Sequence, residues 1–121
     1  MKSCLVVDDS KVVRMVARRI LEGLGFHIEE AENGEDALTT CRESMPDAVL
    51  VDWNMPVKNG LEFLQELRAL PHADQPIVLF CTIENDVDRI RQALSAGANE
   101  YIMKPFDNEI IADKFAQVGL I

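Results

Sequence analysis

Residues 48–56 read AVLVDWNMP, a run of four apolar residues that stops at Asp52. A short, continuous apolar run of this kind is typical of a strand buried on both faces of a parallel sheet. Further strands are predicted at residues 3–7, 77–81 and 100–103, where apolar residues dominate, and at the more polar residues 27–30. The run at 27–30 is polar enough to lie at a sheet edge. We therefore predict five strands, the third over residues 48–51.

Segments with the apolar spacing of helices alternate with these strands. The first helix is predicted to end at Gly23 and Gly25, since glycine commonly terminates a helix. Its spacing predicts a core face made of Val13, Val16, Ala17, Ile20 and Leu24. Four more helices are predicted. Asn33 is expected to cap the second, and Asp107 or Asn108 the fifth.

Strands and helices that alternate five times indicate parallel βα units. Right-handed crossovers in so short a chain predict an α/β fold: a flavodoxin-like, doubly wound, five-stranded parallel sheet of order 2-1-3-4-5, with five helices. The 121 residues fit one domain spanning 1–121, without a segment rich enough in glycine and proline to be an interdomain linker. In such a sheet, a ligand is expected beside the first and third strands.

The composition argues against several classes of function. Acidic residues outnumber basic ones 21 to 12, and the net charge of −9 opposes binding to nucleic acid or to an anionic membrane. No apolar run approaches the ~18 residues of a membrane span, and the apolar run near the start is too short for a signal peptide. Three cysteines without metal-ligand spacing predict buried apolar residues. We expect a cytoplasmic monomer without a nucleic-acid or membrane partner.

Polar side chains stand where the predicted strands end, and these are Asp8, Asp9, Asp52, Thr82 and Lys104. Because the carboxyl ends of parallel strands line the binding crevice, these side chains are expected to converge. Carboxylates held close together repel one another unless they are protonated or neutralised by a cation. Mg²⁺ prefers oxygen ligands of this type. Three carboxylates, a hydroxyl and an ammonium therefore predict a Mg²⁺-dependent site for phosphoryl transfer.

The segments LVVDDS, AVLVDWNMP, VLFCTIEN and YIMKPF resemble the active site of the CheY-like response regulator receiver domains, and the match runs along nearly the whole chain. The resemblance implies that Asp52 is the phosphoacceptor. It also implies that Mg²⁺ is bound by Asp9, Asp52 and the main-chain carbonyl of Asn54, with Asp8 acting through water.

The resemblance assigns further roles at the strand ends. Lys104 would neutralise phosphoryl charge, and a cis peptide bond would join it to Pro105. Thr82 and Tyr101 would form the switch that responds to phosphorylation, with Thr82 contacting the phosphoryl group and Tyr101 turning inward. The fourth helix, the fifth strand and the fifth helix would form the output surface.

Two more groups of residues follow from the resemblance. The lifetime of the phosphoryl group would be tuned by Asn54, Ile83 and Glu84. Ile83 departs from the family pattern, which has Ala, Gly or Ser there, so we expect its side chain to slow access to Asp52. Docking of a kinase or a histidine phosphotransfer helix is expected on the outward side of the first helix, at Arg14, Met15, Arg18 and Arg19.

These features predict a stand-alone response regulator that takes a phosphoryl group from a histidine kinase or a histidine phosphotransfer protein and binds a downstream target protein. It would be a signalling protein rather than an enzyme, with self-catalysed phosphotransfer and autodephosphorylation only. Chemotaxis or motility is the preferred role. A phosphorelay intermediate, a phosphate sink and a phosphate-independent docking module are alternatives. A flavodoxin-type carrier is disfavoured because Asp8 and Asp9 would repel its phosphate, and a haloacid-dehalogenase-type phosphatase because its DxD pattern is missing.

Overall fold

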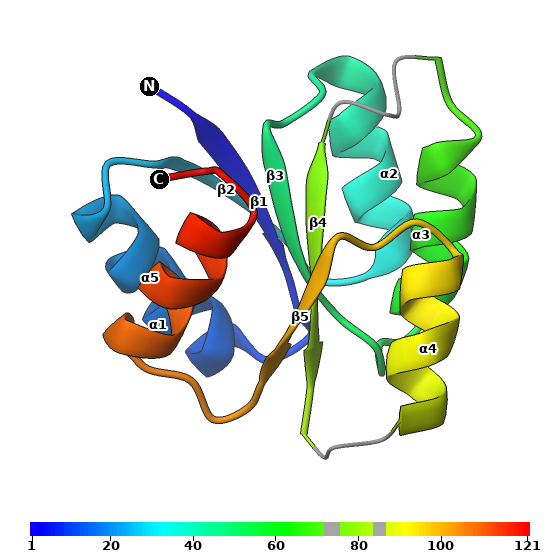
Figure 1. Cartoon of the computed structure of the whole chain (residues 1–121). Coiled ribbons are helices and arrows are strands. Elements are labelled where there is room, and N and C mark those ends of the chain that lie inside the picture. The colour runs from blue at the N-terminus through cyan, green and yellow to red at the C-terminus, as the bar shows by residue number, and fades with distance from the viewer. Residues whose placement is uncertain (72–75, 84–86) are drawn as a thin grey trace.

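The computed structural model of the chain describes residues 1–71, 76–83 and 87–121 (Figure 1). The strands are β1 (Ser3–Val7), β2 (His27–Ala31), β3 (Ala48–Asp52), β4 (Ile77–Thr82) and β5 (Glu100–Met103). The helices are α1 (Lys11–Gly23), α2 (Gly34–Glu43), α3 (Gly60–Arg68), α4 (Val87–Ser95) and α5 (Asn108–Gln117). β2, β3 and β4 each extend one residue beyond the predicted end. Asp52 and Thr82 are therefore the last residues of their strands.

The strands form one parallel sheet of order β2-β1-β3-β4-β5, which confirms the predicted flavodoxin-like, doubly wound fold. β2 lies at a sheet edge, as its polar sequence predicts. Across the pair β1 and β3, Val7 is in register with Val51. The residue that follows each of these valines is an aspartate. The register of the two strands therefore places Asp8 beside Asp52.

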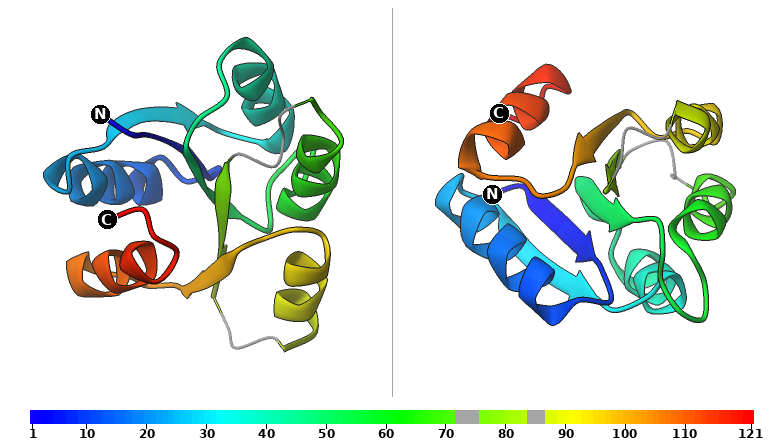
Figure 2. Two further views of the ribbon diagram at one scale, coloured as in Figure 1. Left: turned by 45° about the horizontal axis from the view of Figure 1, so that its top comes forward. Right: turned by 90° about the horizontal axis from the view of Figure 1, so that it is seen from below.

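Helices cover both faces of the sheet, with α1 and α5 on one face and α2, α3 and α4 on the other (Figures 1 and 2). Successive residues of a strand point to opposite faces, so each central strand contributes to both cores. Leu5 and Val7 pack toward α2 and α3, whereas Cys4 and Val6 pack toward α1 and α5. The two cores hold the central strands between them and fix the strand ends that carry the polar residues.

Side-chain caps define where the helices begin. The predicted caps Asn33 and Asp107 are confirmed, because each side chain accepts a hydrogen bond of 2.9 Å from the main-chain N–H three residues further on. Ser10 caps α1, and Asn59 caps α3 in a reciprocal capping box with Glu62. Caps of this kind satisfy main-chain groups that the helix leaves unpaired. The caps at Ser10 and Asn59 fix the starts of the two helices that follow Asp8 and Asp52.

The buried face of α1 is rotated from the predicted one. Ala17 is fully buried as expected, but Val16 is 45% exposed. The buried residues of this helix are Arg14, Ala17 and Leu21. The predicted spacing left out Leu21, and it left out Arg14 because that residue is charged; the head group of Arg14 has polar partners described below.

The three cysteines are free and buried, which confirms that they serve as apolar core residues. Within residues 1–71, 76–83 and 87–121, no helix has the length and apolar character that crossing a membrane requires.

Candidate functional site

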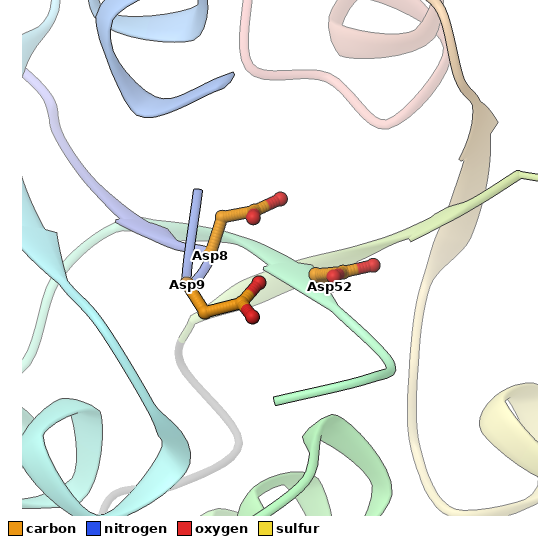
Figure 3. A group of neighbouring side chains, drawn as sticks. All are labelled: Asp8, Asp9 and Asp52. Atoms are coloured by element: carbon orange, nitrogen blue, oxygen red, sulfur yellow. The ribbon is translucent and has the colours of Figure 1, made fainter. Parts of the chain in front are cut away.

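The carboxyl end of the sheet brings together three carboxylates (Figure 3). Asp8 and Asp9 lie in the turn that follows β1, and Asp52 is the last residue of β3. Asp8 and Asp52 are buried, whereas Asp9 is exposed. Each residue offers one carboxylate oxygen, and these oxygens all lie within 4.8 Å of one another. Such crowding of negative charge is unfavourable without a neutralising cation.

The donor set fits a hard divalent cation. It consists of oxygen atoms only, which is the ligand type that Mg²⁺ prefers. The spread of 4.8 Å is close to ~4.2 Å, about twice the usual Mg–O distance, so small side-chain rotations suffice to bring the oxygens around one ion. The exposed position of Asp9 leaves the site open to solvent, which suits an ion that keeps several of its waters.

Lys104 brings one positive charge to this cluster from the segment after β5. Its Nζ donates to Asp8 Oδ2 at 2.7 Å and lies 3.3 Å from Asp52 Oδ1. The peptide bond between Lys104 and Pro105 is cis, as the resemblance implies. One ammonium among three carboxylates leaves the site with net negative charge, which again favours a bound cation.

The surroundings shift the pKa of both Asp52 and Lys104. Burial raises the pKa of the Asp52 carboxyl above its ordinary value, since desolvation disfavours the charged form. The nearby charge of Lys104 opposes this rise, and that of Asp8 adds to it. For Lys104, burial acts to lower the pKa, but the hydrogen bond to Asp8 and the charges of Asp52 and Asp8 outweigh it, and the pKa is raised. Lys104 is therefore a permanently charged partner near neutral pH.

Arg14 supports the site from inside and does not point outward as predicted. It is only 8% exposed, and its Nη1 donates to the main-chain carbonyl of Asp8 at 2.6 Å. Its Nε donates to Glu30 of β2 at 3.0 Å. Glu30 also accepts a hydrogen bond of 2.6 Å from Arg18. The guanidinium of Arg14 can be buried because a carbonyl and a carboxylate satisfy its donors.

Replacing Glu30 by Gln is expected to lower the free energy of unfolding in a pH-dependent way. The hydrogen bond from Arg18 holds the pKa of Glu30 below its ordinary value; burial opposes this effect, and Arg14 adds to it. The stabilisation is therefore present above the ordinary pKa and is lost as the pH falls through the lowered one. The expected loss at pH 7 is about 0.5–1.5 kcal/mol after allowance for solvent screening.

Urea unfolding of the native chain, Glu30→Gln and Glu29→Gln from pH 7 downward measures this effect. The neighbouring Glu29 is exposed and provides the matched carboxyl-to-amide change. The difference between native and Glu30→Gln should shrink below about pH 4, as the native carboxylate becomes protonated. A difference that stayed constant down to the acid limit would contradict the role given to the ion pair.

A hollow with a volume of about 270 Å³ opens beside Asp52. Its lining includes Asp52, Asn54, Thr82, Ile83 and Arg89. Ile83 is 67% exposed and borders both this hollow and a neighbouring one that is lined by Lys104 and by residues of α1. Glu84, the third of the predicted tuning residues, lies outside the described residues.

Tyr101 and the outer face of α1 are not part of the carboxylate cluster. Tyr101 of β5 is half-buried, and Lys114 Nζ lies 4.4 Å from the centroid of its ring. Met15 is exposed on α1, as predicted, and Arg18 is partly exposed while it pairs with Glu22 and Glu30. Of the predicted docking residues, Arg14 alone is thus buried.

Two features of the site were missed by sequence reasoning. The ion pair between Arg14 and Glu30 joins α1 to β2, and the pairing of Ser3–Val7 with His27–Ala31 could have suggested it, because Glu30 stands in register with Val6. Arg89 of α4, in contrast, belongs to no motif. Its position over the Trp53 ring, with Cζ 5.2 Å from the ring centroid, depends on how α4 packs.

Comparisons with known proteins agree with this geometry. The sequence profile described as the response regulator receiver domain matches residues 4–116. The chemotaxis protein CheY of Pseudomonas aeruginosa is 34% identical over 115 residues, which cover 94% of this chain and 93% of that protein.

Solved structures show the same fold. The chemotaxis response regulator CheY4 of Vibrio cholerae superimposes with a TM-score of 0.92 at 29% identity, covering 98% of each chain. The receiver domain of Ssk1 from Saccharomyces cerevisiae, solved in complex with the histidine phosphotransfer protein Ypd1, has a TM-score of 0.89 at 22% identity and covers 98% of this chain and 88% of that one. The profile match, the CheY relative and the carboxylate cluster at the end of the sheet together lead to one conclusion: the chain is a CheY-like member of the response regulator receiver domain family.

Proposed function

We propose that Asp52 accepts a phosphoryl group from a phosphohistidine of a partner protein in a Mg²⁺-dependent reaction. The observation that carries this proposal is the position of the buried Asp52 carboxylate. It shares the carboxylate cluster with Asp8 and Asp9, and it lies 3.3 Å from Lys104 Nζ. Membership of the receiver domain family supports the same role.

In the proposed reaction, a carboxylate oxygen of Asp52 forms a bond to phosphorus. The N–P bond of the phosphohistidine breaks, and its electron pair stays with the imidazole ring. Lys104, held by its hydrogen bond to Asp8, stands ready to neutralise the charge that the phosphoryl group brings. Asp9, Asp52 and the main-chain carbonyl of Asn54 would hold Mg²⁺, which would supply additional positive charge to the phosphoryl oxygens.

The chain itself supplies the nucleophile and the charged groups in this proposal. Phosphotransfer and the later loss of the phosphoryl group are therefore self-catalysed, and the chain acts as a signalling protein. Asn54, Ile83 and Glu84 would tune the lifetime of the phosphorylated state. The position of Ile83 between the two hollows supports a role in limiting access to Asp52.

A histidine kinase or a histidine phosphotransfer protein is the proposed phosphoryl donor. The fold shared with the Ssk1 receiver domain, which was solved bound to a histidine phosphotransfer protein, supports this type of partner. Met15, which is exposed on α1, and Arg18, which is partly exposed there, are proposed docking residues. The similarity to a chemotaxis protein favours a role in chemotaxis, with a downstream target protein as the receiver of the signal. A phosphorelay intermediate is the second candidate, favoured by the Ssk1 neighbour.

The signal would pass from Asp52 to the surface through Thr82 and Tyr101. Phosphorylation adds close to two negative charges and strong acceptor oxygens. Thr82 ends β4 next to the hollow beside Asp52, where its hydroxyl can donate to a phosphoryl oxygen. Tyr101 lies on the neighbouring strand with its ring half-buried, and it would turn further inward when Thr82 is drawn toward the phosphoryl group.

A fluorescence titration tests the proposed function. Trp53 is the only tryptophan of the chain and directly follows Asp52. Adding Mg²⁺ should produce a saturable change in its emission that EDTA reverses. Adding beryllofluoride, which mimics a phosphoryl group, should then produce a second change. Asp9→Asn, which removes a carboxylate ligand and keeps Asp52, should lower the apparent affinity for Mg²⁺ in this titration at least about tenfold. The proposal fails if neither ligand alters Trp53 emission and amide NMR shows no shift around Asp52.

A further inference from the structure

Arg89 stands at the rim of the hollow beside Asp52. It lies in the first turn of α4, is half-buried, and holds its guanidinium against Trp53 with Cζ 5.2 Å from the ring centroid. The Trp53 ring in turn packs on Phe80 of β4 at 5.5 Å between centroids. An arginine stacked on an aromatic ring loses side-chain freedom and keeps its charge in a defined place.

Arg89 is the one positively charged residue among the described residues that line this hollow. Among the described residues that line it, Asp52 and Arg89 are the two that carry charge; the others include Asn54, Thr82 and Ile83. Lys104 lines the separate hollow on the other side of Ile83. A donor that approaches Asp52 through the 270 Å³ hollow therefore passes the guanidinium of Arg89, and it comes near the ammonium of Lys104 only at Asp52 itself, where Lys104 Nζ lies 3.3 Å from Oδ1.

We infer that Arg89 is a second phosphate-recognising cation of this site, which draws anionic phosphoryl donors to Asp52 through the hollow beside Trp53. This inference rests on the proposed function of Asp52. The positive charge raises the local concentration of an anionic donor, which would otherwise be repelled by three carboxylates and by a chain of net charge −9. Arg89 acts here as a positioning residue, since the bond to phosphorus is formed by Asp52.

Acetyl phosphate is a suitable probe, because it is a small anion that reacts without a docking surface. In its reaction, a carboxylate oxygen of Asp52 forms the bond to phosphorus, and acetate leaves with the electron pair of the broken P–O bond. Phosphoramidate carries less negative charge at neutral pH and reports how far the effect depends on donor charge. The rate of phosphorylation is measured by intact-protein mass in the presence of Mg²⁺, for each donor and at several salt concentrations.

Three variants separate charge from stacking. Arg89→Gln removes the charge and keeps much of the stem, whereas Arg89→Lys keeps the charge and loses the planar stack. Arg91→Gln is the matched control, because Arg91 lies on the same helix and lines a different hollow, between α3 and α4. Both neutral variants change the net charge of the chain by the same amount.

Arg89→Gln should slow the reaction with acetyl phosphate about 3- to 10-fold at low salt and slow phosphoramidate less. The difference from native should fade as salt rises, Arg89→Lys should retain most of the native rate, and Arg91→Gln should match native. Equal rates for native and Arg89→Gln would overturn the inference, and so would equal losses in Arg89→Gln and Arg89→Lys. If the native chain takes up no phosphoryl group from either donor, Arg89 does not recruit small anionic donors and the inference fails, whereas the proposed function of Asp52 is tested separately by the Trp53 titration with Mg²⁺ and beryllofluoride.

Discussion

Asp52→Asn is expected to abolish phosphoryl uptake, with a loss in rate of at least about 1,000-fold. An amide has no anionic oxygen to attack phosphorus, and its nitrogen is a poor nucleophile. The exchange leaves the shape of the side chain almost unchanged, so the core residues around β3 keep their packing. It also removes one of three crowded negative charges. The variant should therefore remain folded, and the loss of reaction can be assigned to the missing nucleophile.

The measurement is intact-protein mass after incubation with phosphoramidate and Mg²⁺, followed by peptide mapping of the modified residue. Asp113→Asn provides the same chemical change at an exposed position of α5 and should react like the native chain. Addition of EDTA to the native chain should suppress the reaction as well. Uptake by Asp52→Asn at the native rate would show that another residue is the acceptor, and Asp8 or Asp9 would then be the first to test.

The fold and the carboxylate cluster were predictable because both depend on short-range patterns. Apolar runs identify buried strands, and the doubly wound topology brings the ends of the first and third strands together. The topology alone therefore brings Asp8 close to Asp52, whatever the details of side-chain packing. The strand ends were predicted one residue early at Asp52 and Thr82 because a polar residue looks like the start of a loop. In the structure, parallel pairing of Asp52 with Cys81 and of Thr82 with Met103 continues the ladder.

The surroundings of the cluster depend on long-range contacts, and there prediction from sequence was incomplete. Arg14 was expected on the outward side of its helix because charged residues usually face solvent. Its burial depends on Glu30, sixteen residues away on β2, and on the carbonyl of Asp8. Arg89 carried no sequence signal, since its contact with Trp53 depends on where α4 lies on the sheet. Residues of this kind are found from packing and not from spacing.

Gly60→Ala is expected to lower the free energy of unfolding by about 2–4 kcal/mol and to slow phosphoryl uptake at Asp52. Gly60 is the first residue of α3, and its N–H donates to the carbonyl of Trp53 at 2.9 Å. A Cβ on Gly60 would overlap the main-chain carbonyl oxygen of Asp52 and would come within 2.9 Å of the Phe80 ring. The backbone carbonyl cannot swing away without moving the strand end. Relief therefore requires α3 or the end of β3 to shift, and either movement displaces the acceptor carboxylate.

Urea unfolding and the phosphoramidate reaction are measured for Gly60→Ala and for a control variant, Gly23→Ala. Together they test this coupling between stability and function. Gly23→Ala is the matched control, because a Cβ there has no heavy atom within 4 Å and Gly23 lies in helical conformation at the end of α1. That variant should be neutral or stabilised by up to about 1 kcal/mol. It should also react at the native rate, since Gly23 lies just before β2 begins at His27, at the end of the sheet opposite to Asp52. If Gly60→Ala matched Gly23→Ala in both measurements, then the start of α3 would have enough freedom to accommodate a side chain. The position of Asp52 would then be set by the sheet alone, because α3 could move without carrying the end of β3 with it.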